Sequence, residues 1–164
     1  MKTIAVISDT HIPSRMDKLP SELLHALTEV DCIIHAGDIV QMQVIDQLQK
    51  IAPVYAVCGN MDAGELRHIL PQKYILEIEG KKIGITHGAG DPFTIKKRIL
   101  KLFADTPVDC IVFGHTHHAE IETRNNILLV NPGSPTDRVF AKRQSFALIT
   151  IDDAGNLTAD IINF

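Results

Sequence analysis

The chain has 164 residues, of which 45% are apolar and 22% charged, with a formal net charge of −4. This length is typical of one domain and is enough to bury a core without disulfides, so we expect a single domain over residues 1–164. The composition excludes a disordered or collagen-like chain. Acidic residues outnumber basic ones, 20 to 16, which argues against duplex nucleic acid as a stable partner.

The cysteine content and the apolar runs indicate the compartment. Cys32, Cys58 and Cys110 lie in or at the end of apolar runs and form no Cys-x-x-Cys pair, so we interpret them as buried thiols in a reducing compartment. No run approaches the ~18 apolar residues of a membrane span, and the apolar stretch at residues 4–7 is too short for a signal peptide. We expect a cytoplasmic protein without a membrane partner, with a homodimer as the base-rate expectation for an oligomer.

The first half of the chain alternates apolar, β-branched runs with amphipathic segments. Strands are predicted at residues 3–8, 31–36 and 54–57, and helices at 19–30 and 40–51, where apolar residues recur at helical spacing. This β-α-β-α-β alternation predicts parallel strands joined by right-handed crossovers.

The second half has a different rhythm, with shorter strands and one long amphipathic helix. A hairpin is predicted from strands at 74–78 and 82–86 that flank Glu79-Gly80-Lys81. A helix at 92–103 and a buried strand at 108–113 follow. The remaining predicted strands lie at 119–123, 128–131, 146–152 and 157–162. We therefore expect an α/β fold in which two sheets face each other and the helices lie outside.

Polar residues with metal-binding chemistry follow five of the predicted strands. They are Asp9, His11, Asp38, Asn60, His87, His115 and His117. Sites in open α/β sheets form outside the carboxyl ends of the strands, so these side chains should converge at one edge. Any one of them alone is more often a turn former, a helix cap or an ordinary core or surface histidine. Their joint occurrence at strand ends favours a metal site.

The donor types indicate which metals such a site would hold. Carboxylate oxygens mixed with imidazole nitrogens suit Mn²⁺, Fe²⁺, Ni²⁺, Co²⁺ or Zn²⁺, whereas an all-oxygen set would indicate Mg²⁺ or Ca²⁺. Seven donors exceed what one ion uses, so we expect two ions that share a bridging carboxylate. The Asp-x-His spacing places Asp9 and His11 on the same side of an extended chain, and His-x-His does the same for His115 and His117.

The combined pattern D-x-H, G-D, G-N, H-G and G-H-T-H resembles the calcineurin-like metallophosphoesterase superfamily between Asp9 and about Arg138. The short chain, Gly-Asn-Met-Asp at 59–62 and Asn-Pro-Gly-Ser at 131–134 resemble its small prokaryotic phosphodiesterase branch. The resemblance implies a metallo-dependent phosphatase-like fold, a four-layer α/β/β/α sandwich of two facing mixed sheets.

The resemblance also implies a ligand set and an activity. One ion would take Asp9, His11, Asp38 and His117, and the other would take Asp38, Asn60, His87 and His115, with Asp38 as the bridge. We expect two divalent ions, Mn²⁺ before Ni²⁺, Fe²⁺, Co²⁺ or Zn²⁺. The implied function is a metal-dependent phosphodiesterase that hydrolyses small phosphate diesters with a hydroxide activated by both ions. The alternative is a catalytically weak protein-interaction scaffold of the same fold, like the small retromer subunit.

Residues around the ligands carry further expectations. We expect Asp38, Asn60, Asp62 and His87 to be catalytic. The superfamily commonly has a histidine after the asparagine, but here Met61 occupies that position and a thioether has no proton to donate. Asp62 or His118 could assist instead, although Asp62 could equally cap the following helix and His118 could face solvent.

Two further residues have alternatives that the sequence leaves open, and one segment has a single expected place. Arg138 would contact a substrate phosphate or form a surface ion pair, and His35 would be a satisfied core histidine or would orient a ligand. The segment 131–134 is expected to line the rim of the site.

Overall fold

The computed structural model describes all of residues 1–164 and contains two five-stranded sheets. The strands of the first sheet are β1 (Lys2–Ile7), β2 (Cys32–His35), β3 (Val54–Ala56), β9 (Ser145–Ile151) and β10 (Leu157–Asn163). They lie in the order β10-β9-β1-β2-β3. Strands β1, β2 and β3 are parallel, as the alternating pattern predicts, while β9 pairs antiparallel with both β1 and β10.

The second sheet is built from the second half of the chain. Its strands are β4 (Lys73–Ile78), β5 (Lys81–Thr86), β6 (Cys110–Val112), β7 (Glu120–Arg124) and β8 (Ile127–Asn131). They lie in the order β4-β5-β6-β8-β7, with β5, β6 and β8 parallel to one another. The predicted β4–β5 hairpin is present, and Glu79 and Gly80 at its turn both have positive φ.

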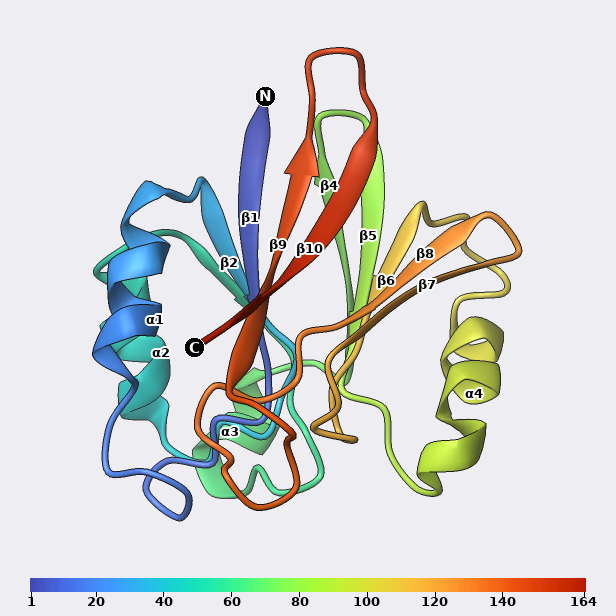
Figure 1. The fold of residues 1–164 in the computed structure, drawn as a ribbon. Helices are drawn as coiled ribbons and strands as arrows, with labels where there is room; N and C mark the ends of the chain where they lie inside the picture. The colour runs from blue at the N-terminus through green and yellow to red at the C-terminus, as the bar shows by residue number, and fades with distance from the viewer.

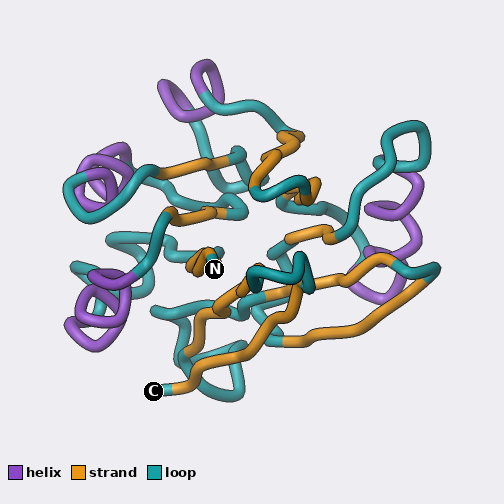
Figure 2. Tube along the Cα trace, turned by 90° about the horizontal axis from the view of Figure 1, so that it is seen from above, coloured by secondary structure: helices purple, strands orange, loops and turns teal.

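Helices cover the outer faces of the two sheets. Helix α1 (Ser21–Ala26) continues into the 3₁₀ turn η1 (Leu27–Glu29), and it packs with α2 (Met42–Gln49) on the first sheet. Helix α4 (Ile95–Leu102), preceded by η2 (Pro92–Thr94), packs on the second sheet. The order α/β/β/α is visible in Figures 1 and 2 and confirms the four-layer sandwich. None of the helices combines the length and apolarity that a membrane crossing needs.

Strand β1 shows how the layers are held together. Successive side chains of a strand point to opposite faces. Ile4 and Val6 therefore pack into the core between the two sheets, whereas Ala5 and Ile7 pack against the helices. A segment covered on both faces must be apolar, which explains the uninterrupted apolar run at residues 4–7.

Helix α2 is shorter than the segment 40–51 predicted from its apolar spacing. It begins at Met42 because Val40 has a φ of 78° and Gln41 is extended, and neither conformation is helical. These residues belong to the loop that follows β2. The carboxyl ends of β1, β2 and β3 meet at one edge of the molecule, at the bottom of Figure 1, where α3 (Gly64–Ile69) also lies.

Removing side-chain volume between the sheets should be costly. Ile34 in β2 is fully buried in the core between the sheets. We expect Ile34→Ala to lower the free energy of unfolding by about 2–5 kcal/mol, measured by urea denaturation. Ile121→Ala is the control, because Ile121 in β7 is 37% exposed, and it should cost under about 1 kcal/mol. Equal losses in the two variants would contradict the assignment of the core.

Candidate metal centre

All seven side chains singled out by the strand-end pattern converge at this edge. They come from the loops after five strands: Asp9 and His11 after β1, Asp38 after β2, Asn60 after β3, His87 after β5, and His115 and His117 after β6. Contacts between their side chains join them into one cluster. The geometry therefore matches the convergence expected at the carboxyl ends of the strands.

Asp9 lies at the centre of the cluster. Its Oδ1 is buried and has no hydrogen-bond partner, and the Nε2 atoms of His117, His11 and His87 lie 3.2, 3.6 and 3.9 Å from it. Its Oδ2 accepts the backbone N–H of His115 at 3.0 Å. A buried carboxylate oxygen without a donor is costly. Because the nitrogens around it are all metal-binding atoms, the donor set fits a divalent cation.

Asp38 lies between the two halves of the cluster. Its Oδ2 is 3.5 Å from His11 Nε2 and 3.2 Å from His87 Nε2, while its Oδ1 accepts the N–H of Met61 at 2.7 Å. One carboxylate oxygen thus faces imidazoles that belong to different expected ion sites. This is the position that a bridging ligand requires.

Asn60 joins the two remaining histidines. Its Oδ1 lies 3.1 Å from His87 Nε2 and 3.0 Å from His115 Nδ1. The other ring nitrogens face carbonyl oxygens, with His87 Nδ1 2.8 Å from Ala36 O and His115 Nε2 2.9 Å from Gly90 O. Donation to these carbonyls fixes each tautomer and leaves a lone pair directed at the cluster, as metal-binding histidines require.

Burial and charge contacts within the cluster shift the pKa values of its residues in opposite directions. Burial raises the pKa of Asp9, but the neighbouring His11 and His117 imidazoles outweigh it, so the pKa of this carboxyl is well below its usual range. Burial lowers the pKa of His87, but the Asp38 carboxylate beside it reverses the effect and raises this pKa. Protonated imidazoles and a metal ion would satisfy the same carboxylates, so they compete for the site.

The backbone of the candidate ligands is unusually strained. Five of them have positive φ: Asp9 (55°), His11 (43°), Asp38 (55°), His115 (71°) and His117 (59°). Residues other than glycine rarely adopt this left-handed conformation, and it persists where surrounding contacts over-determine it. Here the N–H groups of Asp9 and His11 donate to the carbonyl oxygens of Gly37 and Asp38, both at 3.0 Å.

Asp62 supports the loop that carries Asp38 and does not cap the helix that follows it. Its Oδ2 accepts the N–H groups of Asp38 (3.0 Å) and Gly59 (2.7 Å), and its Oδ1 accepts those of Ile39 and Val40 (both 2.7 Å). It makes no cap hydrogen bond to α3, so the helix-cap expectation is wrong. Both carboxylate oxygens of Asp62 accept N–H donors, so Asp62 does not fit the role of a catalytic proton donor. It instead holds the loop that carries Asp38.

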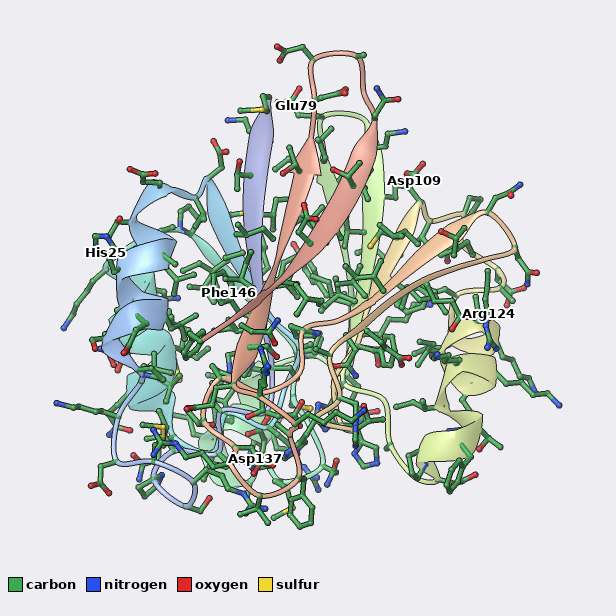
Figure 3. All side chains as sticks on the ribbon, in the orientation of Figure 1. His25, Glu79, Asp109, Arg124, Asp137 and Phe146 are labelled. Carbon is green, nitrogen blue, oxygen red and sulfur yellow. The ribbon has the colours of Figure 1, made fainter.

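Asp137 is a contributor that the sequence analysis missed. This fully buried carboxylate contacts His117 Nδ1 through Oδ2, and its Oδ1 accepts the N–H groups of Val139 (2.7 Å) and Phe140 (3.1 Å). It lies in the loop between β8 and β9, labelled in Figure 3. From the sequence alone, an aspartate in a loop is most often interpreted as a turn former. Only the contact with His117 shows that Asp137 has a positioning role.

The segment 131–134 lies beneath the site and not at its rim. Asn131 Nδ2 donates to the carbonyl oxygen of Gly114 at 3.0 Å, and Ser134 Oγ donates to that of Asp9 at 2.7 Å. Both side chains are fully buried. The expectation of a rim segment is therefore wrong, because these residues hold the ligand-bearing loops from below.

A cavity of about 600 Å³ opens over the cluster. Five of the candidate ligands line it (His11, Asp38, Asn60, His115 and His117), together with Met61, His118, Arg15 and Phe140. His118 is exposed, as expected. Arg138 lies outside this cavity and donates to Gln144 Oε1 at 3.1 Å, so the expected contact with a substrate phosphate does not fit its position.

His35 combines the two roles considered for it. It is fully buried, its Nδ1 accepts the N–H of Gly37 at 3.2 Å, and its Nε2 lies 3.1 Å from Thr10 Oγ1. These contacts hold the turns that carry Asp38 and His11. Burial lowers the pKa of His35 to about 4, so its neutral form supports the site.

Adding a methyl group at Gly114 should disrupt the cluster. A Cβ there would lie 2.0 Å from Ser8 Oγ and 2.6 Å from Asp9 Oδ2, displacing the Asp9 carboxylate. We expect Gly114→Ala to weaken Mn²⁺ affinity about 10- to 100-fold, measured by competition with a chelating dye. Gly155→Ala is the control, because a Cβ there meets nothing within 4 Å and the strain of its positive φ falls in the turn between β9 and β10. Unchanged affinity in Gly114→Ala would contradict the packing described.

The buried His35 should make stability sensitive to acid. Because its folded pKa lies near 4, below the ordinary value of about 6.5, its contribution is present above about pH 6.5 and is lost as the pH falls toward 4. We expect His35→Gln to reduce the loss of unfolding free energy across this window, by about 3 kcal/mol at most, in metal-free protein. His68→Gln, at an exposed helix position, should follow the wild-type profile.

Comparison with known proteins agrees with the fold. The model of the calcineurin-like phosphoesterase superfamily domain matches residues 1–154. A probable metallophosphoesterase of Methanocaldococcus jannaschii is 44% identical over 138 residues, covering 81% of this chain and 68% of the relative. A phosphodiesterase of the same organism is 27% identical over 147 residues, covering 79% of this chain and 82% of the relative.

Solved structures show the same arrangement. A Thermotoga maritima protein solved by NMR has a TM-score of 0.78 and 35% identity, with all of both chains covered. Vps29 of Entamoeba histolytica, solved with Zn²⁺, has a TM-score of 0.79 and 24% identity over 98% of each chain, a likeness of fold. The match over residues 1–154 and the identity to the archaeal relative show that this chain belongs to the calcineurin-like phosphoesterase superfamily.

Proposed function

We propose that the protein is a metal-dependent phosphodiesterase that hydrolyses small phosphate diesters and holds two divalent ions, with Mn²⁺ as the first choice. The observation that carries the proposal is the buried Asp9 Oδ1, which has no hydrogen-bond donor and faces three imidazole nitrogens. The phosphodiesterase relative from M. jannaschii supports the diester preference.

The candidate ligands divide into two sets around Asp38. Asp9, His11 and His117 would hold one ion, and Asn60, His87 and His115 would hold the other, with Asp38 shared. Such ions, when bound, lower the pKa of water and offset the charge that develops on phosphoryl oxygens.

The protein's own groups fix the ligands before substrate arrives. The carbonyls of Ala36 and Gly90 orient His87 and His115, and the Asp137 carboxylate orients His117. Asp62 holds the loop of Asp38. Positions fixed in this way supply the preorganisation that phosphoester hydrolysis uses, because charge stabilisation then needs no rearrangement during the reaction.

Protonation of the leaving oxygen falls to His118 under this proposal. Met61 lines the cavity but has no proton to donate. Asp62 has both oxygens filled by N–H donors, whereas His118 is exposed and lines the cavity. A good leaving group such as nitrophenolate needs little help from it, while an alkoxide needs far more.

A protein-interaction scaffold is the second candidate. Met61 (58%), Phe140 (59%) and Val139 (72%) leave apolar surface exposed at or beside the cavity, and exposed apolar patches mark interaction sites. The complete donor set favours the enzyme, because a scaffold has no need for a buried carboxylate among imidazoles.

The buried free thiols Cys32, Cys58 and Cys110 support a reducing, cytoplasmic location.

Metal content and turnover test the proposal together. Protein stripped with a chelator should show no hydrolysis of bis(4-nitrophenyl) phosphate, and Mn²⁺ should restore it with two ions per chain, measured by elemental analysis. Asp38→Ala should lose both ions, and Asn60→Ala should lose about one, because Asp38 is assigned to both sets.

Asp46→Ala is the matched control, since Asp46 is exposed on α2. It should keep both the metal content and the turnover of the wild type. Full activity in the stripped protein would contradict metal dependence. Bound metal without turnover of any mono-, di- or cyclic ester would favour the scaffold.

A further inference from the structure

Two residues that the metal cluster does not use form a platform in the same cavity. The guanidinium carbon of Arg15 lies 5.0 Å from the ring centroid of Phe140, over its face. The ring centroid of His117 lies 6.2 Å from that of Phe140, with the rings nearly perpendicular at 81°. Phe140 is 59% exposed, and both Phe140 and Arg15 line the cavity over the candidate ligands.

The platform is tied to the cluster through short connections. The Asp137 carboxylate that contacts His117 also accepts the N–H of Phe140 at 3.1 Å. On the other side, the N–H of Arg15 donates to the carbonyl oxygen of His11 at 2.9 Å. The aromatic ring and the cation are thus held at a set distance from two candidate metal ligands.

The chemistry of the platform indicates its ligand. An exposed phenyl ring in a cavity lined mostly by polar groups gains free energy when another flat ring covers it, and aromatic pairs gain more than their buried area alone explains. A guanidinium over a ring adds a cation–π contact and leaves its N–H groups free for a phosphoryl oxygen. Both effects favour an anionic ester that also carries a ring.

We propose that Phe140 and Arg15 bind a planar aromatic group of the substrate, a nucleobase or an aryl ring, while its phosphoryl group occupies the metal cluster. This inference rests on the proposed function and specifies the substrate class. A cavity of about 600 Å³ lies within the size range of pockets that hold molecules of nucleotide size. Phe140 and Arg15 are accordingly specificity-determining residues, separate from the metal ligands.

Phosphonates test the platform without any turnover, because their P–C bond resists hydrolysis. Calorimetric titration of the Mn²⁺-loaded wild-type protein should show phenylphosphonate binding about fivefold more tightly than cyclohexylphosphonate, which matches its size but has no aromatic ring. Phe140→Leu should remove this preference and Phe140→Tyr should keep it. Phe93→Leu is the control, since Phe93 is 96% exposed and lies outside the cavity lining.

A second pair of ligands distinguishes the two sources of the ring. The phosphonate analogue of adenosine 5′-monophosphate should bind about tenfold more tightly than its base-free ribose counterpart if the platform holds a nucleobase. Tighter binding of phenylphosphonate than of cyclohexylphosphonate, without tighter binding of the nucleotide analogue than of its base-free counterpart, would assign the platform to an aryl group.

Equal affinities within both pairs, or preferences that persist in Phe140→Leu, would overturn the platform while leaving the proposed function intact. Failure of every phosphonate to bind the Mn²⁺-loaded protein would overturn the proposed function, and the platform with it.

Discussion

Two buried carboxylates, Asp9 and Asp38, are the constraint around which the functional edge of the protein is organised. Their exposed fractions are 0% and 2%, and burial of two negative charges so close together is expensive unless cations or donors compensate it. The protein supplies imidazoles to both carboxylates and backbone N–H groups to the outer oxygens. The inward oxygens remain for a positive charge, and this is why the cluster indicates metal binding more strongly than its residue types alone.

Holding that pair requires contacts from segments distant in sequence. The Asp62 carboxylate fixes the turn of Asp38, and Ser134 fixes the backbone of Asp9 from more than a hundred residues away. Glycines make the close approach feasible, since any Cβ at Gly59 would lie 2.1 Å from Asp38 Oδ1. The left-handed backbone of the ligands costs free energy, which these surrounding contacts must offset.

The dependence of the site on contacts between distant segments explains what the sequence could and could not predict. The convergence of Asp9 with Asp38 was predictable, because they follow the neighbouring parallel strands β1 and β2, whose carboxyl ends share one edge. His87 follows β5 in the other sheet, so its approach to Asp38 also depends on how the two sheets face each other. The positioning roles of Asp62 and Asp137 were not, because they depend on hydrogen bonds across 20 or more residues. The displacement of Arg138 from the site and the presence of Arg15 within it depend on loop conformations that residue spacing does not encode.

The two sides of the cavity therefore differ in how tightly the fold constrains them. On the inner side, six of the seven candidate ligands are oriented by a carbonyl oxygen, a carboxylate or a left-handed turn, so a substitution there disturbs several neighbours at once. On the outer side Met61 and Phe140 are more than half exposed, and they can change without loss of the core. Under the proposed function, such an arrangement would let one hydrolytic centre serve different esters, because the buried cluster would set the chemistry and the exposed loops the choice of substrate.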